Sequence, residues 1–289
     1  MQPANRYILA LEENRAIFID DIVPALFSHV AHLKTPELHI IGGQPGSGKS
    51  TLINEVADDL KKRFNNESVV SIIGDDFRPF HPHYKKLLEI DASKAAYYTD
   101  TDSGRWVEQA VDLTAQQGNC VVIEGTLHDP EVNLRTASRY IQHGFTAHLH
   151  VLAVHEFLSR FRIFQRYFDE NDNSSHGRYT LLDAHDRSYR VLPESVATLI
   201  DSSLFKTVTL YDQDQNPIKS FNLPEKEARQ NVLAVLEERR NNKHINTAEI
   251  LLAIDGLLPP AKKHGKIYTD LQELHKTLLH CGQISPSSR

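Results

Sequence analysis

The segment GQPGSGKS at positions 43–50 constrains the fold of this chain more than any other stretch. It fits the pattern G-x-x-x-x-G-K-[ST]. A short apolar run at 37–41 precedes it, and a helical pattern from about Lys49 to Phe64 follows it. Glycines let backbone N–H groups turn inward around phosphate oxygens, and a helix N-terminus adds partial positive charge at the same point. This order of strand, glycine-rich turn and helix predicts a phosphate-binding loop.

Within this loop, Lys49 is expected to reach the β- and γ-phosphates, and the Ser50 hydroxyl is expected to bind Mg²⁺. No Asn/Thr-Lys-x-Asp stretch that would suit guanine occurs in the chain. The predicted ligands are therefore ATP and Mg²⁺. The residues expected to contact the nucleotide are Gly43, Gln44, Pro45, Gly46, Ser47, Gly48, Lys49, Ser50 and Thr51.

Strand-like and helix-like patterns alternate through the middle of the chain, which is typical of a mostly parallel sheet with helices on both faces. The predicted fold is α/β, a three-layer P-loop kinase fold that ends in a hairpin. Helices are expected from Arg105 to Gln117 and from His155 to Asp169, and a loop is expected from Phe77 to Tyr84. The predicted strands are Glu37–Ile41, Ser68–Ile73, Cys120–Ile123, Phe145–Val154, Lys206–Tyr211 and Pro217–Phe221.

The two ends of the chain look helical without intervening strands. Leu11–Leu33 shows helical spacing, and after Pro224 only helical patterns follow, with a break expected at Pro259-Pro260 and Lys262–Lys266. The chain is therefore divided into an N-terminal helical segment (1–35), a kinase domain (36–223) and a helical C-terminal extension (224–289).

Composition excludes several classes of protein. The 289 residues carry 32 Lys+Arg and 38 Asp+Glu, a net charge of −6, which argues against nucleic-acid binding and against a basic membrane-surface helix. No run approaches the roughly 20 apolar residues of a membrane span, and the first residues lack a signal-peptide pattern. Two distant cysteines make no disulfide framework. A cytoplasmic protein is expected.

Two carboxylates follow predicted strands directly. Asp75 comes after VVSII and Glu124 after CVVI, so both should face the crevice that holds Lys49, because ligands of open α/β sheets bind at the carboxyl ends of the strands. A kinase needs a group that accepts the proton of the acceptor hydroxyl. Asp75 is the predicted base.

Two arginines flank the polar stretch NDNSSHG at 171–177. Arg166 is expected to close one helix before it, and Arg178 follows it. Forked guanidinium groups match phosphate oxygens, so one interpretation is a mobile lid that covers the transferred phosphate. The alternative is a pair of surface arginines at an exposed helix end.

The GQPGSGKS loop, the G-D-x-F-R-x-x-HPHY stretch at 74–84, VVIEGT at 121–126, and Arg166-Tyr167 with Arg178 and His185-Asp186 resemble the zeta-toxin family over roughly residues 38–221. Those proteins are P-loop kinases of bacterial toxin–antitoxin systems. The resemblance implies transfer of phosphate from ATP to the 3′-hydroxyl of UDP-N-acetylglucosamine, and a small helical antitoxin as a separate partner protein.

The resemblance also implies roles for individual residues. Lys49 and Ser50 match the phosphate and magnesium residues, Asp75 the base, and Arg166 and Arg178 the arginines that clamp the phosphate. The substrate-contacting positions that it implies are Glu108, Glu124, Thr126, His128 and Thr136. This chain has His128 where family members often have an arginine, and its interval between the two arginines is one residue shorter, which leaves the UDP-sugar and the lid geometry open.

Other interpretations remain open at this stage. The acceptor could be another nucleotide-linked or small-molecule hydroxyl, or the chain could be a regulatory ATP-binding module without turnover. A nucleic-acid-end kinase is disfavoured by the net charge. Among the 16 histidines, His81 and His83 are interpreted as shaping the acceptor pocket, and His148 and His150 as packed polar positions beneath a helix.

Overall fold

The computed structural model of the chain describes residues 6–27, 33–64, 68–125, 127–174, 177–223, 225–241 and 245–283. No helix within these ranges is both long enough and apolar enough to cross a membrane.

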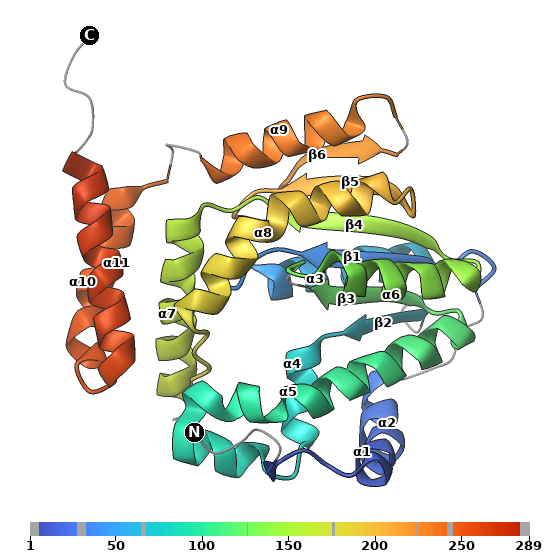
Figure 1. The fold of residues 1–289 in the computed structure, drawn as a ribbon, viewed down its shortest axis with the longest axis horizontal. Helices are drawn as coiled ribbons and strands as arrows, with labels where there is room; N and C mark the ends of the chain where they lie inside the picture. The colour runs from blue at the N-terminus through green and yellow to red at the C-terminus, as the bar shows by residue number, and fades with distance from the viewer. Residues whose placement is uncertain are drawn as a thin grey trace.

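A six-stranded sheet in the order β2-β3-β1-β4-β5-β6 forms the centre of the molecule (Figure 1). Its first five strands run parallel, and β6 pairs antiparallel with β5. The α/β fold with a mostly parallel sheet is thereby confirmed. The strands are β1 (Glu37–Gly42), β2 (Val69–Ile72), β3 (Cys120–Gly125), β4 (Thr146–Leu152), β5 (Phe205–Tyr211) and β6 (Pro217–Asn222).

Helices cover both faces of the sheet because successive side chains of each strand point to opposite faces. In β1, Leu38 and Ile40 pack into one apolar cluster, and Ile41 packs into another. The second cluster includes the apolar side of α3 (Lys49–Phe64). The helices that contribute to the first cluster are α5 (Tyr84–Gln117), α6 (Pro130–Gln142), α8 (Leu182–Asp201) and α9 (Ala228–Arg240).

The helix α5 is much longer than predicted. It begins at Tyr84 rather than Arg105, and the expected loop before it contains α4 (Gly74–Phe77) and a 3₁₀ turn (Arg78–Phe80). Residues 99–104 read TDTDSG, which have weak helix propensity. Tertiary contacts override that preference, since the buried Asp102 accepts hydrogen bonds from the Leu9 N–H and the Asn14 side chain.

The segment before β1 is helical, as predicted, over α1 (Leu11–Ile17), a π-helical turn (Phe18–Ile22) and α2 (Val23–Leu26). The part of the expected helix at residues 28–32 lies outside the described residues. Phe18 and Ile22 are buried in the first apolar cluster, the one that contains Leu38 and Ile40. This segment therefore packs against the sheet side that α5 covers.

The C-terminal helices form a hairpin against one helix of the domain. α10 (Thr247–Ala261) and α11 (Gly265–Gln283) pack on α7 (Glu156–Ser174) beside the sheet (Figure 1). Their shared core includes Phe164, Ile254 and Leu271. Of the break expected at Pro259-Pro260 and Lys262–Lys266, the second part is confirmed, since α10 ends at Ala261 and α11 begins at Gly265. The first part is wrong, since both prolines lie inside α10, near its end.

Candidate active site

The candidate active site lies at the carboxyl ends of three neighbouring strands. The phosphate loop follows β1, Asp75 follows β2, and Glu124 belongs to the last residues of β3. β1 and β3 are in parallel register, with Gly42 beside Gly125, so segments distant in sequence arrive at the same edge of the sheet.

The glycines of the phosphate loop adopt backbone conformations that other residues rarely accept. Gly46 has φ +76° and Gly48 has φ +100°. A Cβ atom on Gly46 would lie 2.0 Å from the carbonyl oxygen of Ser159 in α7. The loop is also tied to that helix by Gln44, whose side-chain amide donates to the Ser159 hydroxyl at 3.1 Å and to the Val154 carbonyl at 2.9 Å.

We expect Gly46→Ala to damage the loop beyond the cost of its positive φ. Gly144 has φ +85°, and a Cβ on it would meet nothing within 4 Å, so Gly144→Ala is a matched control that carries only the backbone strain, about 1 kcal/mol. Gly46→Ala should lower the free energy of unfolding further and should abolish nucleotide binding, measured by thermal unfolding and calorimetry. Equal behaviour of the two variants would contradict a steric requirement at Gly46.

Lys49 begins α3 and is buried beneath the loop. Its Nζ donates to the Gln44 carbonyl at 3.2 Å and lies 3.7 Å from Glu124 Oε1. Burial lowers the pKa of Lys49, and the Glu124 carboxylate only partly offsets this effect. A buried ammonium group with one carboxylate nearby can stabilise an additional anion, as a phosphate-binding lysine must.

A cleft of about 430 Å³ opens above Lys49. It contains six of the nine predicted loop residues together with Asp75, Glu124 and Arg166, whereas Gly43, Gln44 and Ser47 do not line it. The tip of the β5–β6 hairpin also borders it, and Arg162 of α7 donates to the Gln213 carbonyl there at 3.0 Å. The full lining is Pro45, Gly46, Gly48, Lys49, Ser50, Thr51, Asp75, Glu124, Arg162, Arg166, Thr180, Gln213, Asp214 and Gln215.

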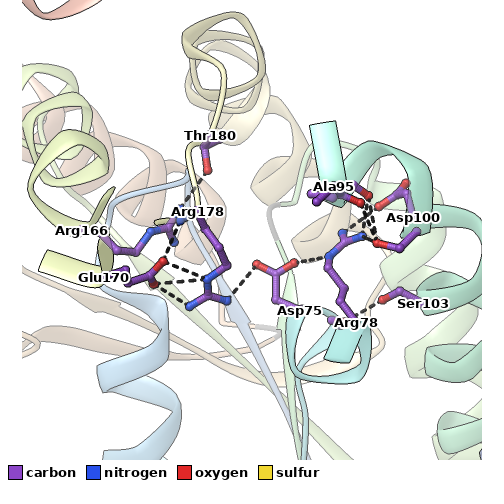
Figure 2. Close-up of polar contacts among 12 residues, drawn as sticks. Asp75, Arg78, Ala95, Asp100, Ser103, Arg166, Glu170, Arg178 and Thr180 are labelled. Atoms are coloured by element: carbon purple, nitrogen blue, oxygen red, sulfur yellow. Dashed lines mark hydrogen bonds and ion pairs between the residues drawn. The ribbon is translucent and has the colours of Figure 1, made fainter. Parts of the chain in front are cut away.

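Asp75 lies between two guanidinium groups, as Figure 2 shows. Its Oδ1 accepts from Arg78 Nε at 2.8 Å, and its Oδ2 lies 3.8 Å from Arg178 Nη1. Burial alone would raise the pKa of Asp75, but the hydrogen bond from Arg78 and the charges of Arg78, Arg178 and Arg166 outweigh it and hold this pKa below its ordinary value. Asp75 is therefore a carboxylate at neutral pH and can accept a proton.

Arg78 orients Asp75 and is itself held by further hydrogen bonds. Besides Asp75, its guanidinium donates to the Ala96 carbonyl at 2.7 Å and the Thr99 hydroxyl at 3.1 Å. It also donates to Asp100 at 2.9 Å (Figure 2). With four partners and a buried side chain, Arg78 is a fixed part of the site.

Arg166 lines the cleft and Arg178 lies 3.8 Å from Asp75 at its border, but the two arginines do not flank a loop of the predicted length. α7 continues to Ser174, so Arg166 lies inside the helix and not at its end, while residues 175–176 lie outside the described part of the chain. The expectation that Arg166 closes the helix is wrong. Arg166 Nη2 donates to Thr180 at 2.9 Å, and Arg178 forms a two-pronged contact with Glu170, the shortest at 2.8 Å (Figure 2).

The C-terminal hairpin supports the elements that carry these arginines. The Tyr179 hydroxyl, next to Arg178, donates to Asp270 of α11 at 2.7 Å. The Tyr167 hydroxyl, next to Arg166, lies 2.9 Å from His264 Nδ1. Both arginines are thus adjacent in sequence to a tyrosine that contacts the C-terminal hairpin, one at α11 and one at the turn between α10 and α11.

We expect Tyr179→Phe to lower the free energy of unfolding by about 1.5–3 kcal/mol, because the buried Asp270 carboxylate loses a short hydrogen bond and keeps, among the described residues, the contact with Lys266 at 3.1 Å. Tyr97→Phe, at a side chain that is 55% exposed, is the matched control and should change little. Denaturant unfolding measures both. A Tyr179→Phe protein as stable as the control would show that this contact does not hold the hairpin.

A second cleft of about 410 Å³ adjoins the first, and the two share Asp75 and Glu124. It lies between α5, the end of β3 and α6, and it includes Glu108, His128 and Thr136. Thr126 lies outside the described residues. The structure therefore brings four of the five predicted substrate positions to one cleft beside the base.

Glu108 stands at the rim of this second cleft and is already paired. Its carboxylate accepts from Arg139 of α6 at 2.9 Å, and Arg139 also lies 3.0 Å from Asp112. Arg139 thus holds the Glu108 carboxylate in place, and a substrate hydroxyl could donate to its remaining lone pairs.

Leu127 fixes the turn that presents His128. It has φ +55°, which is strained for a residue with a Cβ, yet its side chain is fully buried. A Cβ on Gly42 would lie 2.1 Å from Leu127 Cδ1, so the glycine at the end of β1 makes room for this leucine. Strain of this kind persists where surrounding packing over-determines the backbone, and it is frequent at functional sites.

The sequence interpretation missed several residues of the site. Arg78 follows Asp75 by three positions, so one helical turn between them would have indicated the pair. Glu170 lies four residues after Arg166, so the same helical spacing would have placed it beside that arginine. Thr180 and the hairpin residue Gln215 had none, because their approach to the cleft depends on long-range packing.

The polar groups of the first cleft fit a bound triphosphate. Arg166 lines this cleft, and its buried Nε has no hydrogen-bond partner among the described residues. An orphan buried donor is costly, so a ligand rich in acceptor oxygens would satisfy it. The exposed Ser50 lines the same cleft and is available for a metal ion.

Comparison with known proteins gives a consistent result. The family model described as "Zeta toxin" matches residues 25–222. A protein named toxin zeta from Enterococcus hirae is 27% identical over 211 residues, covering 73% of this chain and 71% of that protein. Another toxin zeta, from Streptococcus pyogenes, is 28% identical over 203 residues, covering 70% and 68%.

A solved structure has the same fold. It comes from the PezAT chromosomal toxin–antitoxin system of Streptococcus pneumoniae, matches with a TM-score of 0.72 at 24% identity, and covers 88% of this chain and 98% of that chain. The match extends beyond the family model, so it includes part of the chain outside residues 25–222.

Proposed function

The chain belongs to the zeta-toxin family, and on that premise we propose that it is an ATP- and Mg²⁺-dependent kinase that phosphorylates a sugar hydroxyl of a UDP-sugar, the 3′-hydroxyl of UDP-N-acetylglucosamine first among them. The observation that carries the proposal is the junction of two clefts at Asp75 and Glu124. A phosphoryl donor in one cleft and an acceptor in the other would meet at a carboxylate.

In this proposal the phosphate loop, from Gly43 to Thr51, holds the triphosphate, and Lys49 contacts its terminal phosphates. Ser50 is the magnesium ligand, and Mg²⁺ supplies neutralisation of charge on the phosphate oxygens. The unpartnered Arg166 Nε supports the assignment because Arg166 lines the cleft and an anionic ligand would satisfy this donor.

The transfer step needs little from the protein beyond position and charge. The acceptor oxygen forms a bond to the γ-phosphorus while the bond from that phosphorus to the β–γ bridging oxygen breaks, and ADP departs with the electron pair. The hydroxyl proton passes to the Asp75 carboxylate. Arg166 and Arg178 stabilise the negative charge on the moving phosphoryl group.

The lining of the second cleft favours an acceptor rich in hydroxyl groups. Glu108 and Glu124 offer only acceptors, which hydroxyls satisfy and anionic groups do not. Thr136 and Asn133 add neutral polar groups, and His128 adds an imidazole. A sugar bound through its hydroxyls suits this set.

We also propose that residues 36–223 form the catalytic domain, flanked by the segments 1–35 and 224–289, which the family match over 25–222 supports. The relatives named as zeta toxins and the PezAT system support a role as the toxin of a toxin–antitoxin pair, with a small antitoxin protein as partner. Relief of growth inhibition by Asp75→Asn in cells that express the chain would support this role.

Transfer of labelled γ-phosphate from ATP to a panel of acceptors tests the proposal. The panel contains UDP-N-acetylglucosamine, UDP-glucose, free N-acetylglucosamine and an oligonucleotide with a free 5′-hydroxyl. We expect labelled product with UDP-N-acetylglucosamine. ATP binding without transfer to any acceptor would instead support a regulatory module, and transfer only to the oligonucleotide would support a nucleic-acid kinase.

A further inference from the structure

A second cluster of potential ligand groups lies at the amino end of β1 and β4, away from the phosphate loop at the carboxyl end of β1. Glu37 and His39 share one face of β1, and His148 is paired with His39 across the parallel register. One ligand atom from each of these residues lies within 4.8 Å of the other two. We call them the Glu37–His39–His148 cluster.

We propose that the Glu37–His39–His148 cluster is a Zn²⁺ site, in which Glu37 Oε2, His39 Nε2 and His148 Nε2 are the protein ligands and water completes the coordination. Two imidazoles and one carboxylate are a set that zinc accepts in tetrahedral sites with an open position. None of the three residues takes part in the proposed phosphoryl transfer.

One buried atom of the cluster indicates a ligand. His148 Nε2 is buried and has no hydrogen-bond partner among the described residues. His148 Nδ1 lies 2.8 Å from the Thr207 hydroxyl, so Nδ1 can donate there and leave Nε2 with a free lone pair. A buried lone pair without a donor is costly, and a metal ion would satisfy it.

Other polar atoms of the cluster form hydrogen bonds with residues around it, as the ligands of metal sites do with their outer shell. His39 Nδ1 lies 2.8 Å from His150 Nε2, and His150 Nδ1 lies 2.9 Å from the Tyr211 hydroxyl. Glu37 Oε1 accepts from Arg63 at 2.7 Å. Each ligand thus has one polar atom engaged by a residue outside the cluster, and of the remaining atoms Glu37 Oε2 and His39 Nε2 lie 3.0 Å apart.

The spacing of the ligand atoms permits ligation. Glu37 Oε2 and His39 Nε2 are 3.0 Å apart. Tetrahedral zinc bonds of about 2.0–2.1 Å place ligand atoms roughly 3.3 Å apart, so the widest pair must approach, and the soft χ2 torsion of histidine allows this.

The test is zinc binding to the full chain after treatment with a chelator, measured by calorimetry and by metal analysis after dialysis. We expect one Zn²⁺ per chain, and a rise in melting temperature of at least about 2–4 °C at saturating Zn²⁺. His148→Gln should abolish that site, whereas His143→Gln, at an exposed histidine that contacts the Arg139 carbonyl, should keep it.

Two further measurements separate this site from zinc bound elsewhere. Co²⁺ in place of zinc should give visible absorption of a tetrahedral nitrogen and oxygen site without a thiolate band, because the buried Cys120 is not a ligand. Thr207→Val, which removes an outer partner of His148, should weaken zinc binding about 10- to 100-fold. If His148→Gln fails to fold, Glu37→Gln takes its place. Unchanged zinc binding in these variants, or no stoichiometric binding to the unmodified chain, would overturn the proposal.

Discussion

Replacement of Asp75 by asparagine is expected to reduce phosphoryl transfer by about 100- to 10,000-fold, the range that a positioned general base contributes. Asparagine has nearly the same shape and can still accept from Arg78, whose Nε donates to Asp75 Oδ1 at 2.8 Å. It cannot take the proton of the acceptor hydroxyl. The measurement is kcat with saturating ATP and acceptor.

In contrast to the loss of turnover, the affinity for ATP should be unchanged or higher in Asp75→Asn. Asp75 places a negative charge at the border of the phosphate cleft, so its neutralisation removes a repulsion between protein and nucleotide. Calorimetry should therefore give an ATP dissociation constant that is unchanged or lower. Asp76→Asn is the matched control, because Asp76 is the adjacent exposed carboxylate and does not line either cleft among the described residues. If Asp75→Asn retained more than a tenth of the turnover of the unmodified enzyme, Asp75 would not be the general base.

The pKa of Asp75 adds a pH criterion to the same variant. Because the folded-state pKa lies below the ordinary value of an aspartate, Asp75 stays ionised well into the acidic range, and the loss of rate through its protonation begins only there. The same shift stabilises the fold above the ordinary pKa, and this contribution is lost as pH falls through the folded pKa. In Asp75→Asn, both effects should be absent.

The sequence predicts the parts of this site that depend on local signals. The phosphate loop, Asp75 and Glu124 are each adjacent to an apolar strand, and the parallel sheet necessarily brings such strand ends to one edge. The length of α7 was not predicted, because the polar composition of residues 171–174 favours a loop, whereas the structure continues the helix.

Contacts between distant segments had no signal in the sequence. Tyr179 and Asp270 are 91 positions apart, and nothing near either residue indicates the other. The same holds for the cluster at the amino ends of β1 and β4. His148 and His150 were interpreted as packed polar positions, and only the register of β4 against β1 places His148 beside His39 and Glu37. Side-chain clusters of this kind arise from strand order, which a single sequence does not specify.

Replacement of Arg178 by glutamine should lower kcat by about a thousandfold or more while ATP affinity changes by less than about tenfold. An arginine that stabilises charge developing on the transferred phosphoryl group acts mainly in the transition state, and such arginines account for about 10³–10⁵ in rate. In the structure, Arg178 is held by Glu170, with N–O distances of 2.8 to 3.3 Å, and lies 3.8 Å from Asp75. It is therefore prepositioned beside the base.

The comparison variants separate charge from geometry. Arg178→Lys keeps the charge but loses the planar fork, so it should recover only a small part of the rate. Glu170→Gln keeps Arg178 but weakens its support, so kcat should fall to an intermediate value. Arg229→Gln removes an arginine that is paired with Asp201 at 3.0 Å outside both clefts, and it should leave turnover unchanged. If Arg178→Gln lost ATP affinity strongly while kcat stayed the same, Arg178 would be a ground-state phosphate ligand, and stabilisation of the moving phosphoryl group would rest on Arg166.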